Sequence, residues 1–292
     1  MTKYLILGSD GQLGSELRSR LDKRQIDGGD VTYALADVDE CNITDGAAVA
    51  SYFSSHSDAD VVFNAAAYTA VDDAESNPDA AMAVNGIGAG NVAAACRQID
   101  ARLIHYSTDF VFGDGDGTPF VEEDETNPLS VYGSTKRAGE RLALQNHSAT
   151  AVLRTCGLYS RWGPNFVRSI AGHAREKETL QVVNDQYVGP TPVGPLAEVS
   201  LALADGPLFS GGIYHASVHG ECTWYEFAAE IVELLGLETA VEPTTSKEWG
   251  APARRSRYSV LDNRKLRLHG ADRFDAWDAE LARFVDDHGE KI

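Results

Sequence analysis

The chain has 292 residues, and its 43% hydrophobic content is enough for a large α/β core. Its 44 acidic and 25 basic residues give a net charge of −19, which excludes most nucleic-acid binding because phosphates would be repelled. No run of about 18 apolar residues and no signal-peptide pattern occurs, so we expect a cytoplasmic protein, away from membranes, that acts on small molecules.

Apolar runs alternate with helix-like segments through the first half of the chain. "KYLILG" ends in glycine, and "GQLGSELRSRLDKR" follows with apolar residues at helical spacing. The alternation continues through "VTYALAD", "DGAAVASYFSSH", "DVVFNAAAY", "DAAMAVNGIGAGNVAAACRQ" and "RLIHYST". This rhythm predicts an α/β fold with a mostly parallel sheet, helices on both faces, and ligands at the carboxyl ends of the strands.

The rhythm loosens after "TAVLRTCGLY", where glycine and proline recur in "WGPNF" and "VGPTPVGP". We therefore expect two parts: a dinucleotide-binding domain over residues 1–154, and a smaller region over residues 155–292 that mainly covers the substrate. Some segments of the second part should return to the sheet.

A glycine loop, "GSDGQLG", places Gly8, Gly11 and Gly14 between the first strand and the first helix. Such a loop lets the backbone approach a pyrophosphate at a helix N-terminus, although glycine turns of this kind are also common without a ligand. Asp37 ends the second strand, where a carboxylate can bind an adenosine ribose. No arginine lies between Gln25 and Cys41 to receive a 2'-phosphate, so NADH should be tolerated as well as NADPH.

Thr108, Tyr132 and Lys136 form the candidate catalytic group. Thr108 follows the run "RLIHYS", and Tyr132 and Lys136 are four residues apart in "YGSTKRAGERLALQ", on one face of a helix. A nearby ammonium would lower the pKa of the tyrosine, which could then protonate a ketone held by Thr108. Tyr-x-x-x-Lys also occurs by chance on surface helices, but the glycine loop and the strand-end threonine favour catalysis.

Six segments together resemble the dTDP-4-dehydrorhamnose reductase family of extended short-chain dehydrogenases: "GSDGQLG", "NAAAYTAVDDAE", "YSTDFVFGD", "NPLSVYGSTKRAGE", "NDQYVGPTP" and "PARRSRYSVLDNRKL". The resemblance implies a Rossmann-type doubly wound sheet with a smaller C-terminal sugar-nucleotide region. It also implies reduction of the 4-keto group of dTDP-4-dehydro-β-L-rhamnose to dTDP-L-rhamnose by NADPH or NADH.

The resemblance also implies roles for individual residues. Tyr132 is the proton donor, Lys136 binds the nicotinamide ribose and tunes Tyr132, and Thr108 and Asp109 contact the hexose. The implied cofactor residues are Gly11, Gln12 and Leu13 at the pyrophosphate beside Gly8 and Gly14, Asp37 at the ribose, Asn42 and Ile43 near the adenine, and Ala67, Tyr68 and Thr69 along the cofactor.

Two pairs of residues have competing interpretations. Arg254 and Arg255 could neutralise the substrate diphosphate through bidentate contacts, or they could form ion pairs with neighbouring carboxylates. Asn64 and Asn85 fit a site or an ordinary turn or cap equally well.

The chain also departs from the family pattern. Gly157 stands where a tryptophan is usual, which removes an aromatic wall, and Phe110 and Ser256 replace a tyrosine and a proline. Some family members form homodimers through a magnesium cluster. Glu16 could supply one acid, but Gly194 stands where another is expected, so we predict no metal and leave homodimerisation open.

Two other functions remain open from the sequence. A related sugar-nucleotide dehydratase or epimerase would use the same Tyr/Lys pair; a dehydratase needs a second acid after Asp109, where Phe110 stands, whereas an epimerase is harder to exclude. The regulatory subunit of methionine adenosyltransferase resembles the same family without being a reductase. The four cysteines have no CxxC spacing and are expected to be buried free thiols.

The acidic composition generates the first prediction. A dense carboxylate shell with only seven lysines suits a halophilic protein, in which salt screens the repulsion between surface charges. We expect the free energy of unfolding and any catalytic activity to fall when KCl is lowered from molar to millimolar concentrations. Denaturation curves at both salt levels test this, and identical values would contradict it.

Overall fold

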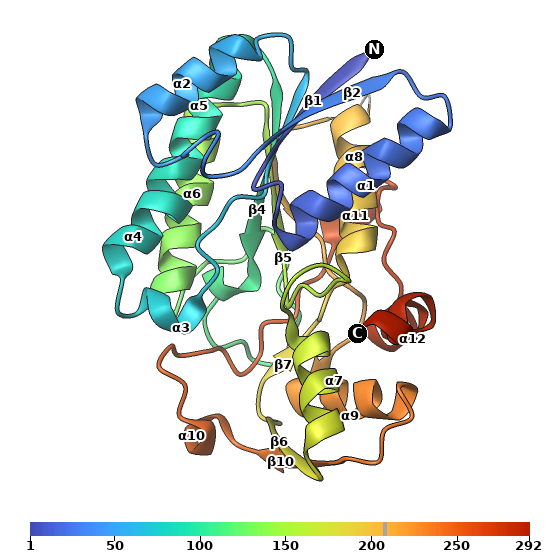
Figure 1. The fold of residues 1–292 in the computed structure, drawn as a ribbon. Helices are drawn as coiled ribbons and strands as arrows, with labels where there is room; N and C mark the ends of the chain where they lie inside the picture. The colour runs from blue at the N-terminus through green and yellow to red at the C-terminus, as the bar shows by residue number, and fades with distance from the viewer. Residues whose placement is uncertain (207–208) are drawn as a thin grey trace.

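A computed structural model describes residues 1–206 and 209–292 of the chain. Its centre is a six-stranded sheet in the order β2-β1-β3-β4-β5-β8 in which every pairing is parallel (Figure 1). The strands are β1 (Thr2–Leu7), β2 (Val31–Ala36), β3 (Val61–Asn64), β4 (Arg102–Thr108), β5 (Thr150–Thr155) and β8 (Gly212–His215). The expected doubly wound α/β fold is confirmed, and the strand order reverses between β1 and β3, where such folds bind ligands.

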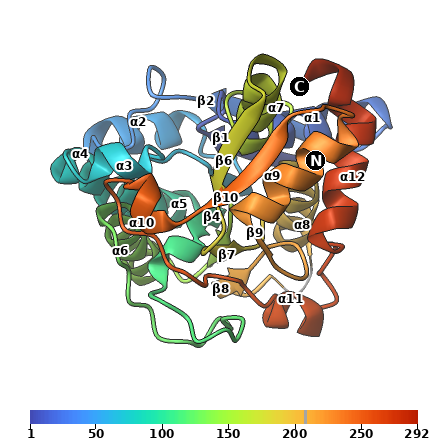
Figure 2. The ribbon, with the colours of Figure 1, turned by 90° about the horizontal axis from the view of Figure 1, so that it is seen from below.

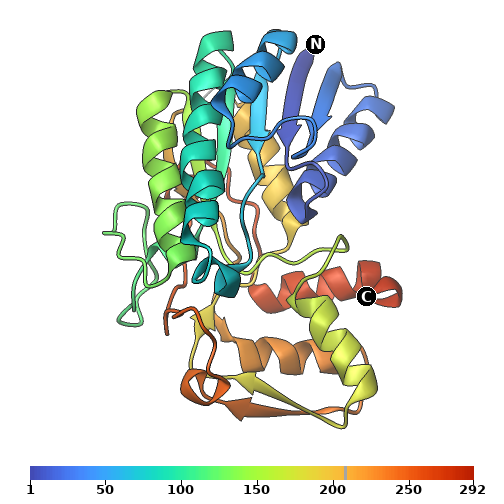
Figure 3. The same ribbon diagram turned by 60° about the vertical axis from the view of Figure 1, so that its left-hand side comes forward.

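Helices cover both faces of this sheet (Figures 1 and 3). One face packs against α2 (Gly46–Ser55), α5 (Ala89–Ile99) and α6 (Val131–Asn146), and the other against α1 (Gln12–Ile26), α8 (Val193–Asp205) and α11 (Arg264–Leu268). Because both faces are covered, the strands are near-continuous apolar runs rather than alternating ones.

A smaller unit lies beyond the carboxyl ends of the strands and has its own apolar core (Figures 2 and 3). In it, β6 (Thr179–Val183) pairs in parallel with β10 (Ala240–Thr244), and β7 (Tyr187–Val188) pairs with β9 (Cys222–Thr223). Its helices are α7 (Phe166–Glu176), α9 (Trp224–Leu234), α10 (Ser246–Trp249), α12 (Trp277–His288) and the short η3 (Gly289–Lys291). By contrast, β8, α8 and α11 also come from the second half of the chain, but β8 is a strand of the large sheet and the two helices cover one of its faces.

The segment "DAAMAVNGIGAGNVAAACRQ", expected as one helix, is interrupted. It contains α4 (Pro78–Met82), a wider π-helical turn over Ala83–Gly88, and α5; a further short helix, α3 (Val71–Ala74), precedes it. Asn85 lies buried in the wide turn. Its Oδ1 accepts a hydrogen bond from the backbone N–H of Tyr68 (2.8 Å), and its Nδ2 donates to the Tyr68 carbonyl (3.1 Å) and to Thr135 (3.2 Å). The interruption therefore ties the loop after β3 to α6.

Two further features concern the cysteines and the length of the helices. All four cysteines are buried free thiols, as expected. Within residues 1–206 and 209–292, no helix is both long and apolar enough to cross a lipid bilayer.

A buried ion pair joins α6 to the sheet. Arg154 of β5 donates to Glu140 of α6 through Nη2 (2.8 Å) and Nε (2.9 Å), and each side chain is only 3% exposed. The Ser107 hydroxyl of β4 donates to the same carboxylate at 2.6 Å. Removing one partner would leave a buried charge without compensation.

This pair generates a prediction about stability. Arg154→Met should lower the free energy of unfolding by about 3 to 5 kcal/mol, because Glu140 would remain buried and unpaired. The double variant Arg154→Met/Glu140→Leu should recover most of that loss, because an apolar pair replaces both charges. Urea denaturation of the three proteins in one high-salt buffer tests this. A loss below about 1 kcal/mol in the single variant would contradict it.

Candidate active site

Thr108, Tyr132 and Lys136 come together at the carboxyl end of β4. Thr108 is the last residue of that strand, and α6 begins beside it, with the Ser130 hydroxyl accepting from the backbone N–H of Gly133 (3.1 Å). Lys136 is buried, and its Nζ donates to the Tyr106 carbonyl of β4 at 2.6 Å. The helix thus brings a phenol and an ammonium to the sheet edge where the sequence placed the chemistry.

The electrostatics of this group differ from the expectation that Lys136 lowers the pKa of Tyr132. Burial and the charge of Asp109 raise the pKa of Tyr132, and the Thr108 hydroxyl lowers it. Burial also lowers the pKa of Lys136 to about 8. The reason for the difference is geometric: the ammonium points to the Tyr106 carbonyl. Tyr132 is therefore a neutral phenol, the form that can donate a proton.

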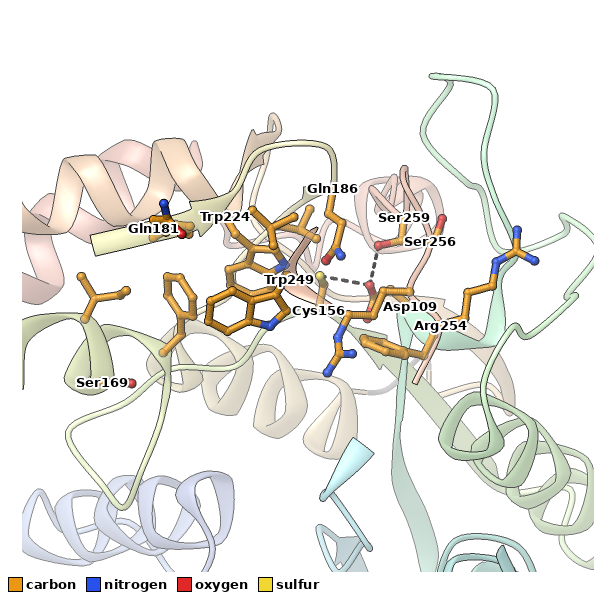
Figure 4. Close-up of a pocket in the computed structure, with 18 of the residues that line it drawn as sticks. Asp109, Cys156, Ser169, Gln181, Gln186, Trp224, Trp249, Arg254, Ser256 and Ser259 are labelled. Carbon is orange, nitrogen blue, oxygen red and sulfur yellow. Dashed lines mark hydrogen bonds between the residues drawn. The ribbon is translucent and has the colours of Figure 1, made fainter. Parts of the chain in front are cut away.

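Asp109 links three segments beneath this group. It lies in the short 3-10 turn η2 (Asp109–Val111) and is 1% exposed. Ser259 donates to its Oδ2 at 2.6 Å, and the Cys156 thiol donates to the same oxygen at 3.2 Å (Figure 4). Thr108 donates to Oδ1 at 2.9 Å. Burial raises the pKa of Asp109, and these three donors lower it. The carboxyl group thereby fixes the orientation of Thr108.

A cleft of about 760 Å³ opens beside Asp109, between the sheet edge and the smaller unit (Figure 4). Its walls include Phe166, Trp224 and Trp249, together with the polar groups of Gln181 and Gln186. No sequence pattern marks these side chains as part of a site, because they come from elements after residue 165 whose placement depends on the folding of the smaller unit. Their spacing along the chain carries no recognisable signal.

Arg254 and Arg255 also line the cleft, and both are paired with acids. Arg254 donates to Asp114 at 2.6 Å, and Arg255 makes a two-pronged contact with Asp72, both at 2.9 Å. The ion-pair interpretation is thus observed. A role in binding a diphosphate would require the guanidinium groups to be shared with, or released from, these carboxylates.

The glycine loop forms a cradle suited to a pyrophosphate. Gly8 has a φ of +73°, and a Cβ there would lie 2.6 Å from the backbone nitrogen of Ala66. Gly11 is the N-cap of α1, so no side chain of the cap residue covers the first-turn N–H groups. Gly14 and the buried Leu13 lie in that turn, and a Cβ on Gly14 would lie 2.7 Å from Ser9 Cα.

The other predicted cofactor residues surround this loop. Oxygens of Asp37, just after β2, accept from the backbone N–H groups of Asp10 (3.1 Å) and Val38 (2.8 Å). Gln12 accepts from the Ser160 hydroxyl at 2.7 Å, which connects α1 to the second half of the chain. The remaining ones follow β2 or β3: Asn42, Ile43, Ala67, Tyr68 and Thr69. The residues present therefore fit a dinucleotide at the carboxyl ends of β1 to β3.

Glu16, the acid that could contribute to a magnesium cluster, forms an ion pair with an arginine. Glu16 accepts from Arg20 at 2.8 Å and from the Trp162 indole at 3.1 Å, and Arg20 also pairs with Glu198. A Cβ on Gly194 would lie 3.0 Å from the Arg20 guanidinium. In the described part of the chain, no three His, Cys, Asp or Glu side chains gather as a metal site.

Comparison with known proteins decides the family. The family model described as the RmlD substrate binding domain matches residues 2–289. The chain belongs to this family. As a member of it, the chain is 44% identical to a dTDP-4-dehydrorhamnose reductase of Streptomyces griseus, over 96% of this chain and 91% of that protein. It is 35% identical to the one of Escherichia coli K12, over 97% of both chains.

Solved structures agree with this membership. A dTDP-4-dehydrorhamnose reductase from Clostridium acetobutylicum superposes with a TM-score of 0.92 at 37% identity, covering 99% of this chain and all of that one. The enzyme from Bacillus anthracis, solved in complex with NADP, also has a TM-score of 0.92, at 33% identity, covering 98% of this chain and 100% of that one.

Burial of Lys136 generates a prediction about pH. Its folded-state pKa of about 8 lies below the usual value of about 10.4, so between these values the unfolded chain binds more protons. The cost of burying the ammonium is therefore present in full below about pH 8, and stability should rise as pH increases from 8 towards 10.4. Urea denaturation across this range should show the free energy of unfolding of the wild type rising, relative to that of Lys136→Met, by up to ~3 kcal/mol in total. Parallel curves would contradict it.

Proposed function

We propose that the chain reduces the 4-keto group of dTDP-4-dehydro-β-L-rhamnose to give dTDP-L-rhamnose, with NADPH or NADH as reductant. The observation that carries this proposal is the placement of Tyr132 and Lys136 on α6 beside Thr108 at the carboxyl end of β4, in a chain that matches the reductase family over nearly its whole length. The solved relative in complex with NADP supports the choice of cofactor.

The two parts of the chain divide the work in this proposal. Residues 1–154 bind the dinucleotide through the glycine loop, Asp37 and the loop after β3, and the bound nicotinamide supplies a hydride. Residues 155–292 mainly bind the sugar nucleotide, while β8 completes the sheet and α8 covers one of its faces. The cleft between the parts is where the substrate would reach the catalytic group.

Tyr132 donates its phenolic proton to the substrate oxygen as that oxygen becomes an alkoxide. Thr108 lies against Asp109, and when its hydroxyl turns from that carboxyl group it can donate to the substrate oxygen, which orients the carbonyl group. Lys136 binds the nicotinamide ribose in this proposal. For its ammonium to stabilise the phenolate as well, it would have to turn from the Tyr106 carbonyl towards Tyr132. Binding of an anionic dinucleotide would favour the charged form of this ammonium.

The identity of the sugar is the part of the proposal with a competing candidate. One relative, from Streptomyces niveus, is named a dTDP-4-keto-6-deoxy-D-glucose reductase and is 35% identical to this chain over 96% of both chains. Members of the family with similar identity thus carry names that specify different 4-keto sugars. All of these names share a dTDP-linked 4-keto sugar, so the reaction type is better supported than the stereochemistry.

Tyr132→Phe tests the proposal. NADH and NADPH oxidation with dTDP-4-keto-6-deoxy-L-hexose, at high salt, should be slower by about 10²- to 10⁴-fold in the variant, because the general acid is lost. The dissociation constant of the dinucleotide should change little, since the hydroxyl group alone is removed.

Three outcomes would contradict the proposed function. Wild-type turnover in Tyr132→Phe would remove the tyrosine from the mechanism. Tightly retained NAD with interconversion of C4 epimers would indicate an epimerase. A stoichiometric complex with a methionine adenosyltransferase, without ketone reduction, would indicate a regulator.

A further inference from the structure

An aromatic ring lies directly over Gly157 in the cleft. Gly157 follows β5 and has a φ of +51°, and a Cβ there would lie 3.0 Å from Cη2 of Trp224 and 3.3 Å from Cα of Pro190. A side chain at this position would compete with the indole for the same space. The absence of a side chain at 157 therefore admits Trp224 to this wall of the cleft.

Trp224 is held from behind by the smaller unit. It is the first residue of α9, whose start is fixed by reciprocal hydrogen bonds between Thr223 and Glu226. Its ring lies 4.6 Å from the ring of Phe166 and 6.3 Å from that of Phe227, centre to centre. Trp224 is half-buried and lines the cleft, so the remaining surface of the indole faces the ligand space (Figure 4).

The position of this ring along the cleft indicates which part of a ligand meets it. Gly157 directly follows Cys156, whose thiol contacts Asp109 at 3.2 Å, so the indole lies at the end of the cleft where the chemistry is placed. Trp249, in contrast, is 61% exposed at the rim. A substrate whose carbonyl reaches Thr108 and Tyr132 would bring its sugar ring, rather than its nucleobase, beside Trp224.

We propose that Trp224, admitted by Gly157, forms the wall of the hexose subsite and helps to determine which sugar is accepted. The C–H groups on one face of a hexose pack well on an indole, which combines a large apolar area with little conformational entropy to lose. This inference rests on the proposed function, because it assumes a dTDP-linked hexose. It goes further in assigning the sugar contact to one residue of the smaller unit.

Trp224→Leu and the matched control Trp277→Leu test the inference. Trp277 also packs against Phe227, at 6.1 Å, but lies outside the cleft, so the control reproduces the loss of aromatic packing without changing the subsite. In Trp224→Leu the dissociation constant of dTDP-L-rhamnose should rise about tenfold, whereas that of dTDP should change less than about twofold. KM for the keto sugar should rise more than kcat falls, and dinucleotide binding should stay unchanged.

Several results would overturn the inference. Unchanged binding of dTDP-L-rhamnose in Trp224→Leu would remove the residue from the site. If binding of dTDP alone is weakened as much as binding of dTDP-L-rhamnose, Trp224 contacts the nucleotide rather than the sugar. If Trp277→Leu weakens binding of dTDP-L-rhamnose as much as Trp224→Leu does, Trp224 acts only through the packing of α9. If Trp224→Leu does not fold, Trp224→Phe takes its place, with a rise of about threefold expected and an unchanged value again contradictory.

The same measurements separate this inference from the proposed function. Wild-type protein that binds dTDP-L-rhamnose and reduces the ketone, with Trp224 variants unaffected, overturns the inference alone. Wild-type protein that neither binds dTDP-L-rhamnose nor reduces the ketone overturns the proposed function, and the hexose subsite with it.

Discussion

The buried contact between Glu140 and Arg154 fixes the geometry on which the active site depends. Glu140 lies one helical turn after Lys136, so the contact that holds α6 to β5 also sets the position of the Lys136 ammonium relative to β4. Ser107 adds a hydrogen bond from β4 to the same carboxylate. The net contribution of such a buried pair to the free energy of folding is small, because desolvation offsets much of its attraction. Its main effect is to orient the two elements that it joins. Here the orientation is what places a phenol beside a threonine.

The catalytic edge of the sheet is further tied to segments far away in the sequence. Asp109 accepts from Cys156 and Ser259, so the ends of β4 and β5 and the C-terminal segment converge on one carboxyl group. Arg255 performs a similar role by joining its segment to Asp72 of the short helix α3. In a chain with net charge −19, ion pairs with Asp114 and Asp72 hold Arg254 and Arg255 at the wall of the cleft.

In the function that we propose, chemistry and substrate choice reside on different parts of the molecule. The sheet edge supplies the phenol, the ammonium and the threonine, whereas the walls of the cleft come mainly from the smaller unit. On this proposal, family members named for different sugars would share the reacting centre and differ in the walls of the cleft. The approach of Trp224 to Gly157 is one such feature, and it joins residues 67 positions apart in the sequence. Trp224 supplies an aromatic surface on the wall of the cleft where Gly157 has no side chain.

The sequence by itself determined the doubly wound sheet, the glycine cradle and the candidate group of Thr108, Tyr132 and Lys136, because strand-end and helix-spaced residues carry local patterns. It also determined membership of the family, through motifs that run the length of the chain. Only the tertiary structure decided that Lys136 donates to the Tyr106 carbonyl and that Arg254 and Arg255 are paired with acids. It also decided that Trp224 covers Gly157. These contacts join residues distant in sequence, and their partners are fixed by packing that no local spacing encodes.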